Sequence, residues 1–287
     1  MIYMKEPDWQ HLLRAIKEQR CSPFLGAGIS YPHLPLGREI ANQWATDYHY
    51  PMPDSDDLIK VSQYLAVTQF PMFPKDEIAR LLKEKTTKPK ASDAHRTLAR
   101  FPITTYLTTN YDDFMAEALK ERFREPKVEI CRWNSLVKKR PSLFDTSYTP
   151  NPANPVVFHL HGHVTDPYSM VLTEDDYFDF LVNVAADSTI IPPAIEQAIT
   201  QSSLLFIGYR LADWNFRVLL RSLTRFMGQG QKRRHFAVMR PPAATEGNEQ
   251  QALEYWNNYY DRLDIQVCWT TADEFLSELG KRWDAAK

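Results

Sequence analysis

Cysteine is scarce in this chain of 287 residues. The three cysteines are Cys21, Cys131 and Cys268, an odd number of residues lying far apart in the sequence. This pattern excludes a disulfide framework, and it excludes a zinc site built on closely paired cysteines. A reducing cytoplasm is therefore the expected location of the protein.

The chain also lacks long apolar runs and an excess of charge of one sign. No run of about 20 apolar residues is present and the N-terminus has no signal-peptide core, so no membrane span and no secretion are expected. The formal net charge is −2, which argues against a general surface for nucleic acid or anionic membranes. A hydrophobic fraction of 44% is ordinary for a soluble globular protein.

Glycine is scarce too, with nine residues where average usage is about 7% of a chain. Each glycine is therefore informative, because it stands where backbone geometry or ligand approach needs it. Gly26 and Gly28 belong to the segment Gly-Ala-Gly-Ile-Ser, directly after a predicted strand at 22–25. Rossmann-type domains use such a strand and turn to hold a pyrophosphate with backbone N–H groups, although a single Gly-x-Gly is a weak signal.

Strands and helices alternate along the chain, which is typical of an α/β, Rossmann-like, doubly wound and mostly parallel sheet. Further strands are expected from 103, at 128–131, from 156, and at 203–208, 234–239 and 265–269. A helix with the apolar stripe Phe216, Leu219, Leu220 and Leu223 is expected after Gly208. We treat 1–287 as a single domain. Proline-punctuated helices predict a helical insertion at about 50–95, with ordinary helical crossovers as the alternative.

Two polar side chains, Asn110 and Asp112, follow the predicted strand that begins at residue 103. The carboxyl ends of parallel strands are where open α/β sheets bind ligands. An amide such as Asn110 both donates and accepts, which suits holding a hydroxyl group and a water molecule. Asp112 has a second interpretation, as the N-terminal cap of a helix over 113–122.

Three histidines, His159, His161 and His163, stand at the end of the strand that begins at residue 156. Side chains alternate along a strand, so His159 and His161 are expected on one face. One hypothesis makes an imidazole the general base beside a nucleotide. The other makes the cluster a metal site, with Gly162 interrupting the alternation before His163. His159 also has a plain interpretation as a hydrogen-bonded core residue.

Four segments, in this order and at this spacing, resemble the sirtuin-like superfamily. They are Gly26-Ala27-Gly28-Ile29-Ser30, Thr108-Thr109-Asn110-Tyr111-Asp112, His159-Leu160-His161-Gly162-His163 and Gly208-Tyr209-Arg210-Leu211-Ala212-Asp213. More closely, they look like the sirtuin-like NAD hydrolases of bacterial anti-phage defence. The resemblance covers roughly residues 22–279 and implies an NAD-binding domain.

The resemblance implies roles for individual residues. Asn110 and Asp112 would lie against the nicotinamide ribose, and His161, directly before Gly162, would be the catalytic histidine. The implied NAD-binding residues are Gly26, Ala27, Gly28, Ser30, Thr109, Gly208 and Tyr209. Asp112 is grouped with Asn110 and His161 as catalytic, since it can orient the amide or stabilise a cation.

The chain departs from the protein-deacylating sirtuins at two places. Those enzymes carry a four-cysteine zinc module after the catalytic histidine, and here no cysteine lies between Cys131 and Cys268. Their Pro-Asp-Phe-Arg segment is replaced by Leu34-Pro35-Leu36-Gly37-Arg38. The resemblance therefore implies NAD+ as substrate, no zinc, and no site for acyl-lysine peptides.

By the same resemblance, the expected activity is cleavage of the nicotinamide–ribose bond of NAD+ to give nicotinamide and ADP-ribose. The protein would be the effector of an abortive-infection system, with a homo-oligomer and a companion chain such as a HerA-like ATPase or an Argonaute-type sensor. Two alternatives stay open. One is a regulatory subunit that binds NAD or ADP-ribose without turnover, and the other is a transferase of ADP-ribose or an acyl group.

Overall fold

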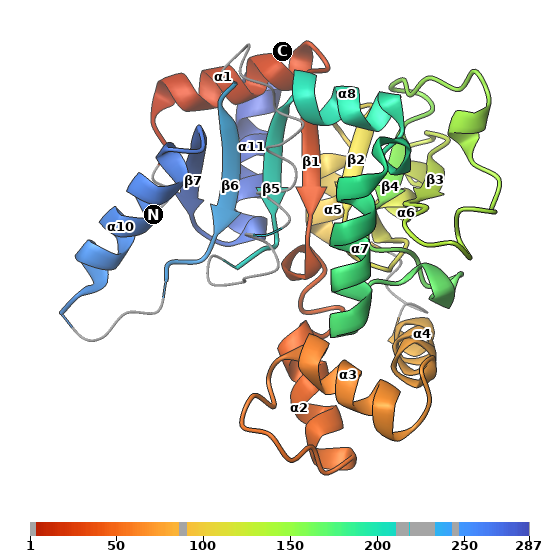
Figure 1. The fold of residues 1–287 in the computed structure, drawn as a ribbon. Helices are drawn as coiled ribbons and strands as arrows, with labels where there is room; N and C mark the ends of the chain where they lie inside the picture. The colour runs from red at the N-terminus through yellow and green to blue at the C-terminus, as the bar shows by residue number, and fades with distance from the viewer. Residues whose placement is uncertain (1–3, 86–90, 211–217, 219–232, 243–246, 287) are drawn as a thin grey trace.

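The computed structural model describes residues 4–85, 91–210, 218, 233–242 and 247–286. Its centre is a seven-stranded sheet in the order β3-β4-β2-β1-β5-β6-β7, and every pair of neighbours is parallel (Figure 1). The strands are β1 Cys21–Leu25, β2 Thr105–Thr108, β3 Lys127–Ile130, β4 Val156–His159, β5 Ser203–Ile207, β6 His235–Met239 and β7 Ile265–Trp269. The predicted Rossmann-like parallel sheet is confirmed. The helix expected at Phe216, Leu219, Leu220 and Leu223 lies outside the described residues.

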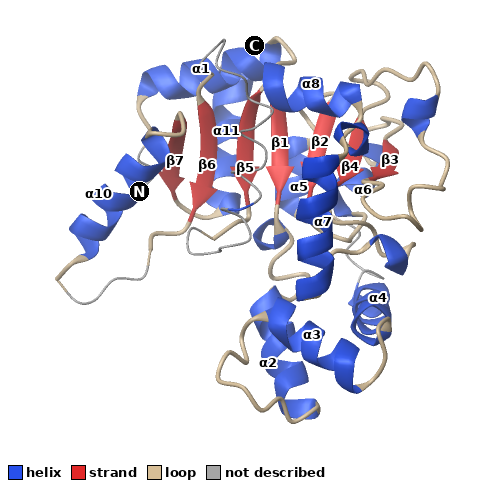
Figure 2. Ribbon diagram, in the orientation of Figure 1, coloured by secondary structure: helices blue, strands red, loops and turns tan. Residues whose placement is uncertain are grey.

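Helices cover both faces of the sheet (Figure 2). One face is covered by α1 Glu6–Lys17, α5 Asp93–Leu98, α6 Phe114–Lys120 and α11 Ala272–Ala285. The other is covered by α7 Glu174–Ala186, α8 Pro193–Gln201 and α10 Glu249–Asp261. None of these helices, nor any other in the described ranges, has the length and apolarity to cross a membrane.

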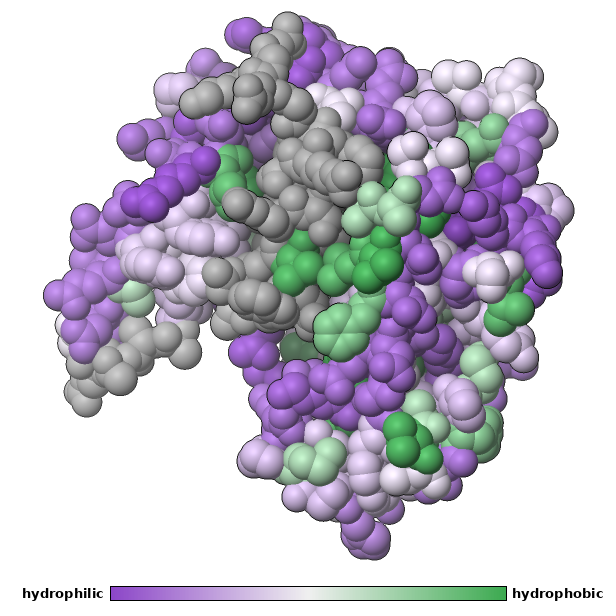
Figure 3. Space-filling model, in the orientation of Figure 1, coloured by the Kyte–Doolittle hydropathy of each residue, from purple (hydrophilic) through white to green (hydrophobic). Residues whose placement is uncertain are grey.

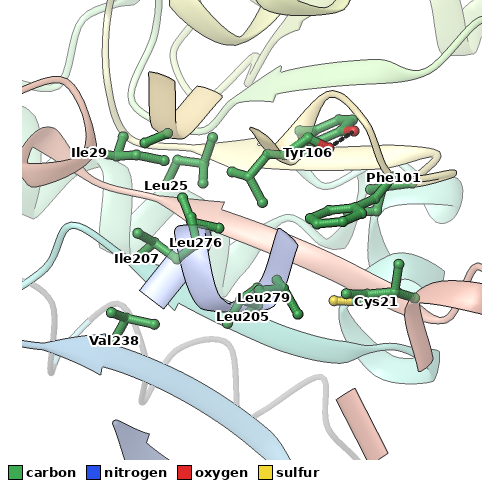
Figure 4. Packing of buried hydrophobic residues seen from close by; sticks show 14 of the residues in the cluster. Cys21, Leu25, Ile29, Phe101, Tyr106, Leu205, Ile207, Val238, Leu276 and Leu279 are labelled. Carbon is green, nitrogen blue, oxygen red and sulfur yellow. Dashed lines mark hydrogen bonds between the residues drawn. The ribbon is translucent and has the colours of Figure 1, made fainter. Parts of the chain in front are cut away.

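One hydrophobic core lies between the sheet and the helices α1, α5, α6 and α11. Leu25 of β1, Tyr106 of β2 and Leu205 of β5 belong to one hydrophobic cluster with Leu276 and Leu279 of α11 (Figure 4). All five side chains are at most 1% exposed. Strands covered on both faces favour continuous apolar runs over alternation, which is why these strands were recognisable from the sequence.

Three further helices form a lobe beyond the carboxyl edge of the sheet (Figure 1). They are α2 Gly37–Asp47, α3 Leu58–Thr68 and α4 Phe73–Lys85. Trp44, Leu65 and Ile78 belong to a hydrophobic cluster of the lobe, which continues to Phe114 at the start of α6. Helices α3 and α4 fall within the segment predicted as an insertion, and α2 precedes it.

Polar contacts fasten this lobe to the start of α7. Lys75 Nζ lies 2.7 Å from Asp176 Oδ1, and both side chains are almost entirely buried. Gln63 Nε2 donates to Asp175 Oδ2 at 2.8 Å. Thr173 and Asp176 cap the helix reciprocally. The lobe thus fixes the N-terminal turn of a helix whose remaining length runs across the sheet.

Candidate active site at the carboxyl edge of the sheet

The strand order reverses between β1 and β5. From β1 the sheet continues through β2 and β4 on one side and through β5, β6 and β7 on the other. Such a switch point opens a crevice at the carboxyl ends of the strands, where α/β proteins bind ligands. The turns after β1, β2, β4 and β5 carry all the residues that the sequence nominated for the site.

The turns after β1 and β5 pack backbone against backbone. The N–H of Gly28 donates to the carbonyl of Gly208 at 2.9 Å, and the N–H of Gly26 donates to that of Ile207 at 2.8 Å. Gly208 has φ +87°, and a Cβ there would lie 2.6 Å from the nitrogen of Ile29. A Cβ on Gly28 would lie 2.9 Å from the Gly208 oxygen. Close approach of the two turns therefore requires both glycines.

These contacts change the expected role of the glycine turn. The N–H groups of Gly26 and Gly28 are engaged with the turn after β5, and the N–H of Ser30 donates to the carbonyl of Ala27. Among the described residues, no acceptor pairs with the N–H of Ala27, which is exposed. Among the residues of the turn after β1 that were predicted to bind phosphate, Ala27 is therefore the one whose backbone N–H is available to a ligand.

Tyr209 closes the junction from the β5 side. Its ring lies over Gly26, where an added Cβ would come within 2.8 Å of Cε1. Its hydroxyl donates to the carbonyl of Leu25 at 3.0 Å and lies 3.0 Å from Thr109 Oγ1. The structure thus brings Thr109 and Tyr209 together with the glycine turn.

Asn110 joins the same junction from β2. Its Nδ2 donates to the carbonyl of Gly26 at 3.2 Å, and its backbone N–H donates to Thr108 Oγ1 at 3.0 Å. The side chain is half-buried. One amide hydrogen of Asn110 is therefore committed to the protein.

Asp112 is buried behind Asn110. Its Oδ1 accepts from the N–H of Phe114 at 2.9 Å, and its Oδ2 accepts from Ser30 Oγ at 3.4 Å. Burial is the main cause that raises the pKa of the carboxyl to about 6. The N-terminal cap of α6 is Asp113, so the interpretation of Asp112 as that cap is wrong. Asp112 nevertheless accepts from the first N–H of the helix and also links the β2 turn to Ser30.

His161 lies beneath α7. Its ring packs edge-on against Tyr177 and Phe180 with ring centroids 5.2 Å apart in both cases, and its Nδ1 lies 3.4 Å from the Tyr177 hydroxyl. The residue is 5% exposed, and burial lowers the pKa of the imidazole to about 3. His161 is therefore neutral at physiological pH.

The expectation that His159 and His161 share one face of a strand is wrong. β4 ends at His159, and residues 160–161 form a turn. His161 consequently packs against α7, whereas the His159 ring faces His163, with centroids 4.5 Å apart. Within the described ranges, no group of three His, Cys, Asp or Glu side chains is placed to hold a metal ion.

Tyr177 and Phe180 are site residues that the sequence analysis missed. They stand three positions apart on α7, so they share one helix face, and this face covers His161. Phe178 and Val182 on the same helix are exposed instead, at 66% and 65%. Figure 3 shows apolar side chains gathered on this side of the molecule. The spacing of this aromatic pair is a sequence signal for a buried helix face, but it does not indicate that the face packs on His161.

A separate cavity of about 420 Å³ lies where the lobe meets the start of α7. It is lined by Tyr50, Met52, Pro53, Asp54, Lys60, Gln63, Tyr64, Val67 and Glu174. None of the nominated site residues lines it. We therefore place the candidate active site at the sheet edge, where the polar groups converge, and not in this cavity.

Comparison with known proteins gives a match to one family model. A family model described as a SIR2-like domain matches residues 104–260, more than half of the chain. These residues include the turns after β2, β4 and β5. Asn110, Asp112, His161 and Tyr209 all fall within the matched segment.

Three curated proteins that resemble the chain carry the name NAD(+) hydrolase ThsA. The protein from Enterococcus faecium is 27% identical over 238 residues, covering 79% of this chain and 44% of the relative. Those from Acinetobacter baumannii (strain 532279) and Bacillus cereus (strain MSX-D12) are 23% and 25% identical, covering 85% and 84% of this chain and 47% and 48% of the relatives. The chain thus spans less than half the length of these proteins.

Proposed function

Because the chain belongs to the SIR2-like domain family, we propose that it is an NAD+ hydrolase that releases nicotinamide and ADP-ribose. The observation that carries the proposal is the junction at the switch point. There the Asn110 amide donates to the Gly26 carbonyl, and Tyr209 links the same turn to Thr109. A ribose-binding amide, a glycine turn and an aromatic ring thus meet at the edge where such sheets bind nucleotides.

Cleavage of the nicotinamide–ribose bond does not require a general acid. Nicotinamide leaves NAD+ as a neutral molecule, so its departure needs no proton. The ribose carbon becomes oxocarbenium-like, as in glycoside hydrolysis. The site must therefore orient the ribose, stabilise a developing positive charge and position one water molecule.

Asp112 and Asn110 are suited to the first two tasks. With a pKa of about 6, most Asp112 carboxyls are ionised at pH 7, and a buried carboxylate stabilises a nearby cation strongly because the surrounding dielectric is low. The Asn110 amide oxygen accepts from a ribose hydroxyl or from the attacking water. Its fixed donation to Gly26 sets the direction in which that oxygen points.

His161 serves as the proton acceptor. An imidazole with a pKa near 3 is a weak base, but water that has begun to bond to an oxocarbenium ion is itself strongly acidic. A weak neutral acceptor is sufficient at that stage. Because Tyr177 and Phe180 cover the ring, substrate access to His161 requires α7 to shift.

The direct test follows nicotinamide and ADP-ribose by chromatography after incubation of the full chain with NAD+. We expect release by the wild-type chain, alone or with the products of neighbouring genes, and loss of at least about 100-fold in Asn110→Ala and His161→Asn. Asn134→Ala and His235→Asn are matched controls. Asn134 bonds Tyr168, Leu136 and Val137, and His235 is a buried histidine on β6 that accepts from Leu204. These hydrogen bonds involve none of the nominated site residues.

The controls should retain turnover per folded molecule. An Asn110→Ala variant with full turnover would refute the site, and absence of release in every condition would refute the activity. Calorimetric binding of ADP-ribose without any release would favour the regulatory-subunit alternative. Label retained on a macromolecule would favour the transferase.

We further propose, from the resemblance to defence NAD hydrolases, that the activity arrests phage-infected cells and is controlled by oligomerisation or a companion chain. Uncontrolled loss of NAD+ would kill the host, and the cover on His161 is consistent with a site that is held inactive. Phage plating on cells that express the chain with its genomic neighbours tests the role. Protection that survives His161→Asn would exclude NAD+ hydrolysis as its cause.

A further inference from the structure

His159 is a buried histidine that the proposed chemistry does not use. It is the last residue of β4, paired in register with Thr108 of β2 and Ile130 of β3, and it is 0% exposed. Its Nδ1 lies 2.8 Å from the backbone carbonyl oxygen of Asn110. The ring therefore contacts the residue that we place against the ribose, from behind.

The hydrogen bond fixes the tautomer of the ring. A carbonyl oxygen only accepts, so Nδ1 of His159 carries the proton. Burial lowers the pKa of this imidazole to about 3, so the ring is neutral and its Nε2 carries no proton. Nε2 is buried and has no hydrogen-bond partner among the described residues. A buried acceptor without a partner costs stability, so simple packing does not account for a histidine here.

A second histidine holds the ring in place. His163 packs edge-on against His159 at 4.5 Å between ring centroids. His163 Nδ1 lies 2.8 Å from Thr165 Oγ1, and its Nε2 lies 3.0 Å from Asp113 Oδ1. With both nitrogens engaged, His163 presents a fixed wall to His159.

Asn110 is thus anchored at three points. Thr108 Oγ1 accepts from its N–H, the Gly26 carbonyl accepts from its side-chain amide, and His159 donates to its carbonyl. We propose that His159 is a positioning residue, whose Nδ1–H holds the Asn110 backbone so that the amide oxygen faces the substrate. This inference rests on the proposed NAD+ hydrolase function.

Two substitutions separate positioning from packing. His159→Leu keeps a buried apolar side chain and removes the donor. His159→Asn places an amide N–H close to the position of Nδ1. We expect kcat for nicotinamide release to fall roughly 10- to 100-fold in His159→Leu, because misplacement of a catalytic group by about 1 Å has effects of that size. KM should change less than about threefold, and His159→Asn should recover most of the lost kcat.

A double-mutant cycle tests the route of the effect. If His159 acts only by positioning the Asn110 amide, removal of the His159 side chain should have no further effect in a variant that lacks this amide. In an Asn110→Ala background, His159→Leu should therefore lower kcat by less than about twofold. A further loss equal to that of the single variant would show an effect independent of Asn110 and would overturn the proposal.

His235 supplies the matched control. It is also a buried histidine, but its Nδ1 accepts from the N–H of Leu204 at 3.0 Å, so its proton is on Nε2. Long-range ¹H–¹⁵N spectra of the full chain should show opposite tautomers for the two rings. His235→Leu should lower thermal stability and leave kcat per folded molecule unchanged. A proton on Nε2 of His159 would overturn the proposal without any assay of activity.

The NAD+ hydrolase function and the positioning role of His159 are tested separately. Wild-type protein that releases no nicotinamide in any assembly overturns the proposed function and this inference with it. Active wild type with an equally active His159→Leu overturns the inference alone. If His159→Leu does not fold, the test relies on His159→Asn and on the spectra. Equal kcat values for His159→Asn and wild type, together with a proton on Nδ1 of His159 in the wild type, support the proposal. A proton on Nε2 of His159 refutes it.

Discussion

The N–H of Gly28 donates to the carbonyl of Gly208 at 2.9 Å, which joins the turn after β1 to the turn after β5. The two residues are far apart in the sequence, but the turns that contain them follow the neighbouring strands β1 and β5. The glycines that resemble a phosphate-binding turn are thus required first by contact between two protein turns. The shape of the candidate site depends on this contact, because Tyr209 and Asn110 are both positioned against Gly26.

Gly208→Ala should therefore destabilise the protein and abolish NAD+ turnover. The new Cβ would lie 2.6 Å from the Ile29 nitrogen and closer still to the Gly26 oxygen, in a backbone conformation with φ +87°. We expect the free energy of unfolding to fall by about 3 kcal/mol, since strain and overlap add. Urea unfolding followed by circular dichroism measures the change.

Gly247→Ala is the control for backbone strain. Gly247 has φ +84°, and apart from its chain neighbours no atom of the described residues lies within 4 Å of an added Cβ, so it carries the conformational penalty without the overlap. Its cost should be about 1 kcal/mol. Equal losses in the two variants would contradict a role for close packing between the turns.

Asp112→Asn should stabilise the protein at pH 7.5 while lowering its activity. The folded pKa of about 6 exceeds the reference value of 3.8, so between those pH values the folded state holds a proton that the unfolded state has lost. Stability therefore falls as the pH rises through this window. Asparagine removes that loss, and we expect a gain of about 3 kcal/mol at pH 7.5 and little gain below pH 4.

Asp113→Asn should lower the stability of the protein at pH 7.5, whereas Asp112→Asn should raise it. The hydrogen bond from His163 is the main cause that lowers the pKa of the Asp113 carboxyl. A lowered pKa contributes stability above the unfolded value, and this stability is lost as the pH falls through the folded pKa. The effect should be small because the side chain is 46% exposed. If Asp112→Asn and Asp113→Asn changed the free energy of unfolding in the same direction at pH 7.5, the opposite pKa shifts assigned to the two carboxyls would be contradicted.

The pH dependence of turnover should follow Asp112. If its carboxylate stabilises the oxocarbenium ion, kcat/KM is constant above pH 7 and falls about tenfold per unit well below pH 6. His161, with its pKa near 3, stays neutral across this range. Nicotinamide release measured from pH 4.5 to 8.5 tests this. A profile that stays flat down to pH 4.5 would show that turnover does not require the Asp112 carboxylate.

The sheet and the positions of Asn110 and Asp112 were accessible from the sequence for a physical reason. Strands buried on both faces leave continuous apolar runs, and parallel strands bring their carboxyl ends to one edge. The contact between Gly28 and Gly208 was not accessible, because it depends on which strands are neighbours. The prediction that His161 shares a strand face with His159 was wrong, because side chains alternate only within a strand and β4 ends two residues before His161.

The contact of α7 with His161 could not be predicted from local sequence patterns either, since it depends on how the lobe holds that helix. Helical periodicity identifies an apolar face but not its partner. The ion pair between Lys75 and Asp176 joins residues of α4 and α7 that are distant in the chain. Local sequence therefore specified the elements, and long-range contacts set the environment of the imidazole.

Lys75→Met should loosen the cover on His161. The Lys75–Asp176 pair is almost fully buried at 2.7 Å, so removal of the ammonium group leaves a buried carboxylate without its counter-ion, at a cost of about 3 kcal/mol. The start of α7 should open more readily, because Tyr177 follows Asp176 directly. Hydrogen exchange of α7 amides should accelerate, and the pKa of His161 should rise from about 3 towards its ordinary value as burial decreases.

Lys60→Met provides the contrast within the same lobe. Lys60 pairs with Asp54 at a more exposed position, and surface pairs contribute little, so exchange in α7 and the titration of His161 should be unchanged. If α7 restrains substrate access, Lys75→Met should also raise NAD+ turnover by the chain alone, after correction for the folded fraction. Faster exchange with unaltered turnover would show that the cover on His161 does not limit the reaction, and control would then have to act elsewhere on the domain.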